Sequence, residues 1–127
     1  MYSNDKSPLA YKSANFSGRV IKMVKYLYGN KDPELKSLYE QILRSGTSIS
    51  ANIGESQFAQ SSADFITKLH IALKEANETR QWLNLLYSSN CINAIQHESM
   101  NKDLSEIIAM LVSSLNTAKR NQKIIVK

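Results

Sequence analysis

The sequence predicts an all-α protein, an antiparallel up-down four-helix bundle that forms a single domain. Four Gly and two Pro in 127 residues are too few for the many tight turns of an all-β fold. Apolar residues recur at steps of three and four along four long segments, which is the helical period. The link over residues 90–93 is short, so we expect the last two helices to be antiparallel neighbours.

The first predicted helix covers residues 13–28, and residues 1–12 precede it as an N-terminal extension. Its apolar stripe consists of Phe16, Val20, Met23 and Leu27. Gly29 and Asn30 should end the helix, because both tolerate the left-handed conformation of a C-terminal cap.

The second predicted helix covers residues 33–59. Asp32 is expected to cap its free N–H groups, and Pro33 suits its first turn. Its buried seam is predicted as Leu35, Leu38, Ile42, Ser45, Ile49, Asn52 and Ser56. The second half of this seam is small and polar, which favours close approach of a neighbouring helix.

The third predicted helix runs to about residue 89, with Ser61 as its N-cap and Asp64 in its first turn. Its apolar residues spread over more than half of the circumference, whereas a surface helix shows a stripe of about 100° or somewhat more. They are Phe65, Ile66, Leu69, Ile71, Ala72, Leu73, Ala76, Thr79, Trp82, Leu83, Leu85 and Leu86. We therefore expect this helix to be central or covered by a second subunit, and we favour the second subunit.

The fourth predicted helix covers residues 98–121, which completes a bundle over residues 13–121. Its stripe consists of Met100, Leu104, Ile107, Leu111, Leu115 and Ala118. Residues 122–127 form a basic C-terminal tail that is either disordered or docked through its apolar Ile124–Val126 segment.

The net charge of +5 is concentrated at the two ends of the chain. One explanation is that Lys and Arg solubilise helix surfaces; the other is a basic surface for a polyanion such as nucleic acid. The predicted phosphate contacts are Arg19, Lys22, Lys25, Lys119, Arg120 and Lys123.

Glu75 falls inside the apolar arc of the third helix, where an unpaired carboxylate is costly. Arg44 is the expected partner, because it is the one basic residue in the apolar half of the second helix. The predicted polar network comprises Arg44, Asn52, Glu55, Glu75 and Glu78. Its role is expected to be register between helices, in preference to metal or acid–base chemistry.

No catalytic residue, metal ligand set or cofactor is predicted, so we do not expect an enzyme. Neither His70 nor His97 has a Glu three residues before it, as a di-metal bundle site requires, and no glycine-rich phosphate loop is present. Cys91 is expected to be an inert thiol. The longest apolar run, residues 107–112, is too short to span a membrane, so a cytoplasmic protein is the default expectation.

Two stretches resemble a known family. Residues 44–56, RSGTSISANIGES, form the first; Ser61, Phe65, Ile71-Ala72, Glu75 and Glu78, followed by Leu83, form the second. Together they resemble the bacterial four-helix-bundle proteins encoded by intervening sequences in 23S ribosomal RNA genes. That family also includes the accessory variability determinants of diversity-generating retroelements.

The resemblance implies an up-down four-helix protomer assembled into a homopentameric barrel, with no catalytic residue to carry over. For the retroelement members it also implies a basic surface that binds RNA or DNA and docks a reverse transcriptase. The leading hypothesis is therefore a non-enzymatic oligomeric scaffold that binds nucleic acid. The alternative is a protein–protein adaptor whose basic surface meets an acidic partner.

Overall fold

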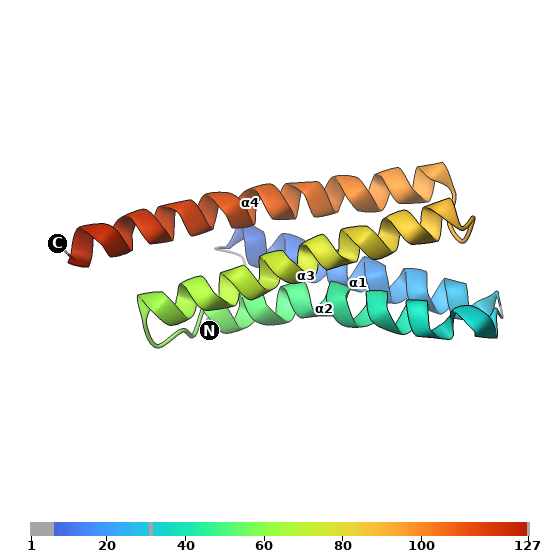
Figure 1. Cartoon of the computed structure of the whole chain (residues 1–127), viewed down its shortest axis with the longest axis horizontal. Coiled ribbons are helices and arrows are strands. Elements are labelled where there is room, and N and C mark those ends of the chain that lie inside the picture. The colour runs from blue at the N-terminus through green and yellow to red at the C-terminus, as the bar shows by residue number, and fades with distance from the viewer. Residues whose placement is uncertain (1–6, 31, 127) are drawn as a thin grey trace.

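The computed structural model describes residues 7–30 and 32–126, without the side chains of residues 33 and 123–126. Four long helices follow one another: α1 (Pro8–Gly29), α2 (Lys36–Ser56), α3 (Ser62–Ser88) and α4 (Ala94–Val126). A short 3-10 helix, η2 (Pro33–Leu35), precedes α2. Successive helices run in opposite directions along one long axis (Figure 1), and the described ranges contain no strand. The predicted all-α class and four-helix arrangement are confirmed.

None of the helices, within the part of the chain that the structure describes, has a stretch long and apolar enough to cross a membrane.

Two helices begin earlier than the apolar stripes predicted. Helix α1 starts at Pro8, because the Ser7 hydroxyl accepts a hydrogen bond from the N–H of Ala10 and proline suits the first turn. Helix α4 starts at Ala94, because Asn93 and Gln96 exchange side chain–backbone hydrogen bonds of 2.8 Å in a capping box. The predicted extension over residues 1–12 therefore includes the first turn of α1.

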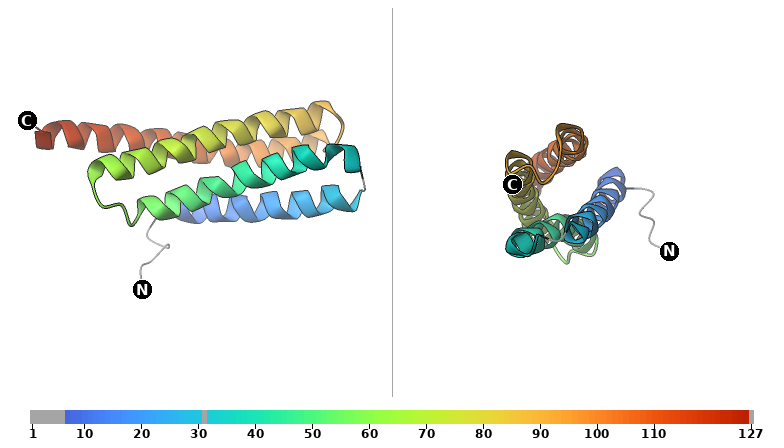
Figure 2. Two further views of the ribbon diagram at one scale, coloured as in Figure 1. Left: turned by 60° about the horizontal axis from the view of Figure 1, so that its bottom comes forward. Right: turned by 90° about the vertical axis from the view of Figure 1, so that its right-hand side faces the viewer.

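The C-terminal end also differs from the prediction, since the α4 backbone stays helical through Val126. It extends past the ends of the other helices in Figures 1 and 2. The predicted tail over residues 122–127 is therefore, as far as residue 126, a continuation of α4.

The predicted cap of α3 is confirmed, that of α2 is wrong, and α1 ends at Gly29 and Asn30 as predicted but without the left-handed conformation. Asn30 ends α1 with φ −80°, in the right-handed region, and Asn90 (φ 62°) is the only described residue with a left-handed backbone. Leu35 at the start of α2 has no side-chain cap; only the backbone oxygen of Asp32 accepts its N–H, at 3.0 Å, because the chain enters through η2. The Ser61 hydroxyl accepts the N–H of Asp64 at 3.0 Å, as predicted.

The core lies along the bundle axis and takes residues from all four helices. Its fully buried large side chains include Phe16, Leu27, Ile49, Leu69, Leu83, Leu104 and Leu111. On α2 the predicted seam contained Asn52, but Ile53 is buried there and Asn52 lies at the edge. After Ile49 the buried seam therefore steps by four residues to Ile53 and then by three to Ser56, whereas a step of three and then of four was predicted.

Helices α1 and α2 approach closely where their residues are small. A Cβ added to Gly46 would lie 2.9 Å from both γ carbons of Val20. The Ser17 hydroxyl donates to the Gly46 carbonyl at 2.9 Å and lies 2.7 Å from the Ser50 hydroxyl. The small, polar part of α2 is thus a helix-packing surface whose hydroxyls are satisfied across the contact.

Helices α1 and α4, the first and the last, are the least closely packed pair of neighbours (Figure 2). Two ion pairs bridge them: Lys12 to Glu106 at 2.8 Å and Arg19 to Asp103 at 2.5 Å.

One flank of α3 is uncovered in the single chain. Ala72, Ala76 and Leu83 are buried against the neighbouring helices, whereas Ile71 and Leu85 are exposed. The wide apolar arc therefore has a buried part and a solvent-facing part.

Candidate nucleic-acid interface

The four cations of α1 fall into two classes. Lys12 and Arg19 are neutralised by carboxylates of α4, and Glu106 raises the pKa of Lys12 by accepting a hydrogen bond from it. Lys22 and Lys25 are exposed and form no ion pair with any described residue. Of the three predicted phosphate contacts on α1, Lys22 and Lys25 therefore carry a charge that no described carboxylate neutralises, whereas Arg19 is paired with Asp103.

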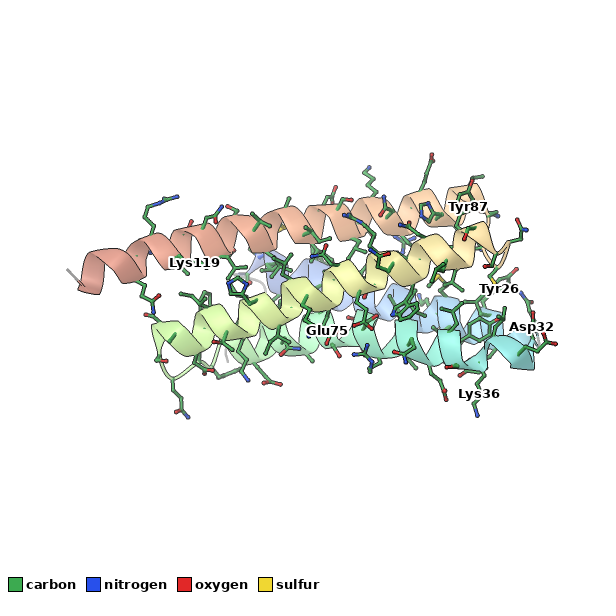
Figure 3. The ribbon with its side chains drawn as sticks, viewed as in Figure 1. Tyr26, Asp32, Lys36, Glu75, Tyr87 and Lys119 are labelled. Carbon is green, nitrogen blue, oxygen red and sulfur yellow. The ribbon has the colours of Figure 1, made fainter. Side chains whose placement is uncertain are left out.

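The predicted C-terminal contacts lie far from those of α1. Lys119 and Arg120 are exposed on α4, and the side chain of Lys123 lies outside the described residues. Met100 lies beside Lys22, and Lys119 follows it at about 28 Å along the helix, at about 1.5 Å per residue. Figure 3 shows Lys119 and Tyr26 toward opposite ends of the bundle. The fold does not bring the two predicted basic clusters together.

Three further lysines are exposed without an ion pair in the described ranges: Lys36, Lys74 and Lys102. The prediction did not select them, because they are scattered singly on α2, α3 and α4. Arg80 is instead held by neutral groups, with its Nε 3.2 Å from Asn101 Oδ1 and an Nη 2.6 Å from Ser105 Oγ.

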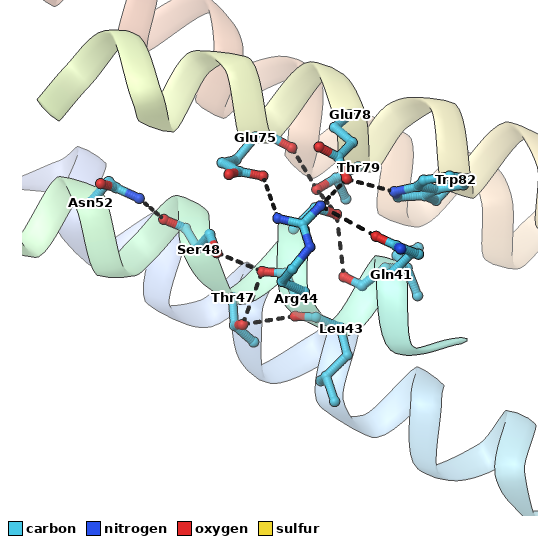
Figure 4. Close-up of polar contacts among 12 residues, drawn as sticks. Gln41, Leu43, Arg44, Thr47, Ser48, Asn52, Glu75, Glu78, Thr79 and Trp82 are labelled. Carbon is cyan, nitrogen blue, oxygen red and sulfur yellow. Dashed lines mark hydrogen bonds and ion pairs between the residues drawn. The ribbon is translucent and has the colours of Figure 1, made fainter. Parts of the chain in front are cut away.

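The predicted pairing of Arg44 with Glu75 is confirmed (Figure 4). Arg44 donates to Glu75 Oε1 at 3.2 Å and also forms an ion pair with Glu78. Glu78 in turn accepts a 3.0 Å hydrogen bond from the Trp82 indole. The Glu75 side chain is only 16% exposed, so one guanidinium serves two partly buried carboxylates across the α2–α3 contact.

Asn52 and Glu55 do not join this network, contrary to the prediction. The Asn52 amide donates to the Ser48 carbonyl of its own helix at 2.8 Å. Glu55 pairs with Lys68 at 3.1 Å and raises its pKa by accepting a hydrogen bond from it. Both residues lie at least two turns beyond Arg44 on α2, out of reach of its side chain.

The described side chains offer no group of three or more His, Cys, Asp or Glu residues arranged to hold a metal ion. The thiol of Cys91 is half-buried, and burial, followed by the negative charge of Asp32, raises its pKa. A raised pKa disfavours the nucleophilic thiolate.

A family model described as "23S rRNA-intervening sequence protein" matches residues 7–113, most of the chain. The chain belongs to the 23S rRNA-intervening sequence protein family. A crystal structure of a protein of unknown function, from the S23 ribosomal protein family of Bacteroides thetaiotaomicron VPI-5482, is similar to this member. It is 48% identical, with a TM-score of 0.80, and the match covers 84% of this chain and 97% of the other. A search of curated proteins found no match.

In this member of the 23S rRNA-intervening sequence protein family, the residues of the first resembling stretch have structural partners. Arg44 binds the carboxylates of α3, the hydroxyls of Ser45 and Thr79 lie 2.9 Å apart, and Gly46 contacts α1. This stretch therefore joins α2 to both of its neighbours.

Proposed function

We propose that the protein is a non-enzymatic, oligomeric helical scaffold that binds RNA or DNA through the exposed cations of α1. The observation that carries the proposal is the difference between Lys12 and Arg19, which are paired, and Lys22 and Lys25, which are not. Cations without a carboxylate partner are free to neutralise phosphates.

The expected binding mode is electrostatic. Each neutralised phosphate releases counterions, so the logarithm of affinity falls by about 0.9 per log unit of salt on duplex DNA. Two lysines in one chain form a small basic patch, but symmetric repetition in an oligomer multiplies it and adds avidity.

The uncovered flank of α3 supports the oligomeric part of the proposal. Ile71 and Leu85 are 36% and 47% exposed, and Trp82 beside them is half-buried. We propose that a second copy covers this flank, in the homopentamer that the sequence resemblance implies. Light scattering coupled to gel filtration should give the mass of a pentamer for the native chain and a smaller mass for Leu85→Glu.

Ile95→Glu is the matched control for that measurement, because Ile95 is 78% exposed and belongs to a different helix, at the start of α4. A monomeric native chain, or equal effects of the two substitutions, would refute the proposed interface.

Nucleic-acid binding is tested by fluorescence anisotropy with a structured RNA and a duplex DNA, from low to physiological salt. The double substitution Lys22→Ala, Lys25→Ala should weaken binding and make the salt dependence shallower. Lys74→Ala with Lys36→Ala removes the same charge from α2 and α3 and should have a smaller effect.

Absence of binding by the native chain at low salt would refute the nucleic-acid proposal. The basic patch would then belong to a protein adaptor with an acidic partner, for which a reverse transcriptase is the candidate that the resemblance suggests.

A further inference from the structure

A pocket of about 290 Å³ opens between α1 and α4 beside the exposed lysines. We call it the Tyr26 pocket; it is lined by Arg19, Lys22, Met23, Tyr26, Gln96 and Met100. Its volume is close to the lower end of the roughly 300–1,000 Å³ typical of small-ligand sites, so it suits one small ring system.

The apolar surfaces of the Tyr26 pocket suit an aromatic ligand. Tyr26 is 55% exposed, so much of its ring is available for stacking. Met100 is only 4% exposed and belongs to the core, and Met23 is half-buried against that core. Thioether sulfurs make favourable contacts with aromatic rings.

The polar groups of the pocket are mainly hydrogen-bond donors. Gln96 Oε1 already accepts the N–H of Asn93 at 2.8 Å in the capping box of α4. This bond fixes which end of the amide is oxygen, and it leaves Nε2 without a partner among the described residues. The capped amide therefore offers N–H groups to a ligand.

The cations are placed on one side of the same opening. Arg19 is held by Asp103 at 2.5 Å and by the Ser99 hydroxyl at 2.7 Å, so its guanidinium is fixed in position. Lys22 lies one turn before Tyr26 on α1, on the same face, and carries an unpaired charge.

We infer that the Tyr26 pocket binds one unpaired base of a single-stranded nucleic acid, stacked on Tyr26 with the adjoining phosphate at Lys22. The inference rests on the proposed function and specifies its substrate class. A duplex cannot enter, because its bases are stacked and their edges are paired.

The test is fluorescence anisotropy at constant low salt, with labelled oligouridine, oligothymidine and a blunt-ended RNA duplex. Tyr26→Ala should weaken oligouridine and oligothymidine binding by about 5- to 150-fold, the range for loss of one stacked base. It should leave duplex binding unchanged, because the substitution removes no charge. Tyr26→Phe keeps the ring and should retain affinity.

Tyr11→Ala is the matched control, because Tyr11 is 61% exposed on the same helix, next to the neutralised Lys12. Equal losses in Tyr11→Ala and Tyr26→Ala, or equal losses on duplex and single strand, would overturn the inference. If the native chain binds the probes but Tyr26→Ala changes nothing, only the pocket is wrong. If the native chain binds none of the probes, the proposed function fails as well.

Discussion

The substitution Gly46→Ala tests the close contact between α1 and α2. The new methyl group would lie 2.9 Å from both γ carbons of Val20 and 3.3 Å from its Cβ. Val20 is fully buried and β-branched, so it has one strongly preferred rotamer in a helix and little room to move. The neighbouring bond from the Ser17 hydroxyl to the Gly46 carbonyl would be disturbed by any separation of the helices.

The magnitude follows from two opposing effects. Overpacking a core costs about 1–3 kcal/mol, and replacing Gly by Ala in a helix gains about 1 kcal/mol. We therefore expect a net loss of up to about 2 kcal/mol in the free energy of unfolding, which lowers Tm by up to about 8 °C for a chain of this length.

Gly54→Ala is the matched control on the same helix. A Cβ there meets nothing within 4 Å, so this substitution should raise the free energy of unfolding by up to about 1 kcal/mol. Urea and thermal unfolding followed by circular dichroism, at one protein concentration, measure both variants.

A Gly46→Ala variant as stable as Gly54→Ala would refute the close contact. Val20→Ala provides a second check, because it should be less damaging in the Gly46→Ala background than in the native chain. Absence of that coupling would show that the two positions are not packed together.

Three further substitutions or measurements test the side-chain environments. Arg44→Leu should destabilise the protein more than Glu75→Leu does, by about 1 kcal/mol in urea unfolding. Arg44→Leu leaves two carboxylates without a partner, whereas Glu75→Leu keeps the Arg44–Glu78 pair. Equal losses in the two variants would contradict the shared ion pair. Burial raises the pKa of Tyr39 above its ordinary value, because the folded chain favours the protonated phenol. The stability that the protonated Tyr39 contributes is therefore fully present below about pH 10 and is lost as the pH rises further. Tyr39→Phe should therefore reduce the loss of unfolding free energy above about pH 10. The same loss in the native chain and in Tyr39→Phe would contradict the raised pKa of Tyr39. Cys91 should react with a disulfide reagent more slowly in the folded chain than in urea, because burial raises its pKa; equal rates would show an accessible thiolate.

The sequence predicted the helices better than their ends. Apolar periodicity identifies a segment that must bury one face, so all four helices were found. Helix starts depend on local hydrogen bonds that can precede the first apolar residue of the stripe. Ser7-Pro8 and the Asn93–Gln96 capping box are legible in the sequence, but both lie before the stripes by which the starts were placed.

Side-chain contacts of the candidate site could be predicted only where they lie between two helices with few charged residues on their facing sides. The Arg44–Glu75 pair was found because few charged residues lie on the facing sides of α2 and α3. The ion pair between Arg19 and Asp103 was not predicted, because it depends on the register of α1 against α4. The apolar periodicity of each helix does not determine that register. The Tyr26 pocket depends on the same register, so it too required the structure.

The order of packing along the chain has a kinetic consequence. Among the described helices, every consecutive pair packs more extensively than α1 and α4, which are the two helices farthest apart in the sequence. Such local topology gives fast folding, and loop-closure entropy makes the distant contact the last to form. Asp103→Asn should therefore leave the folding rate of the chain nearly unchanged and accelerate its unfolding, as separate arms of a chevron plot would show. A slower folding arm would place the α1–α4 contact in the transition state instead.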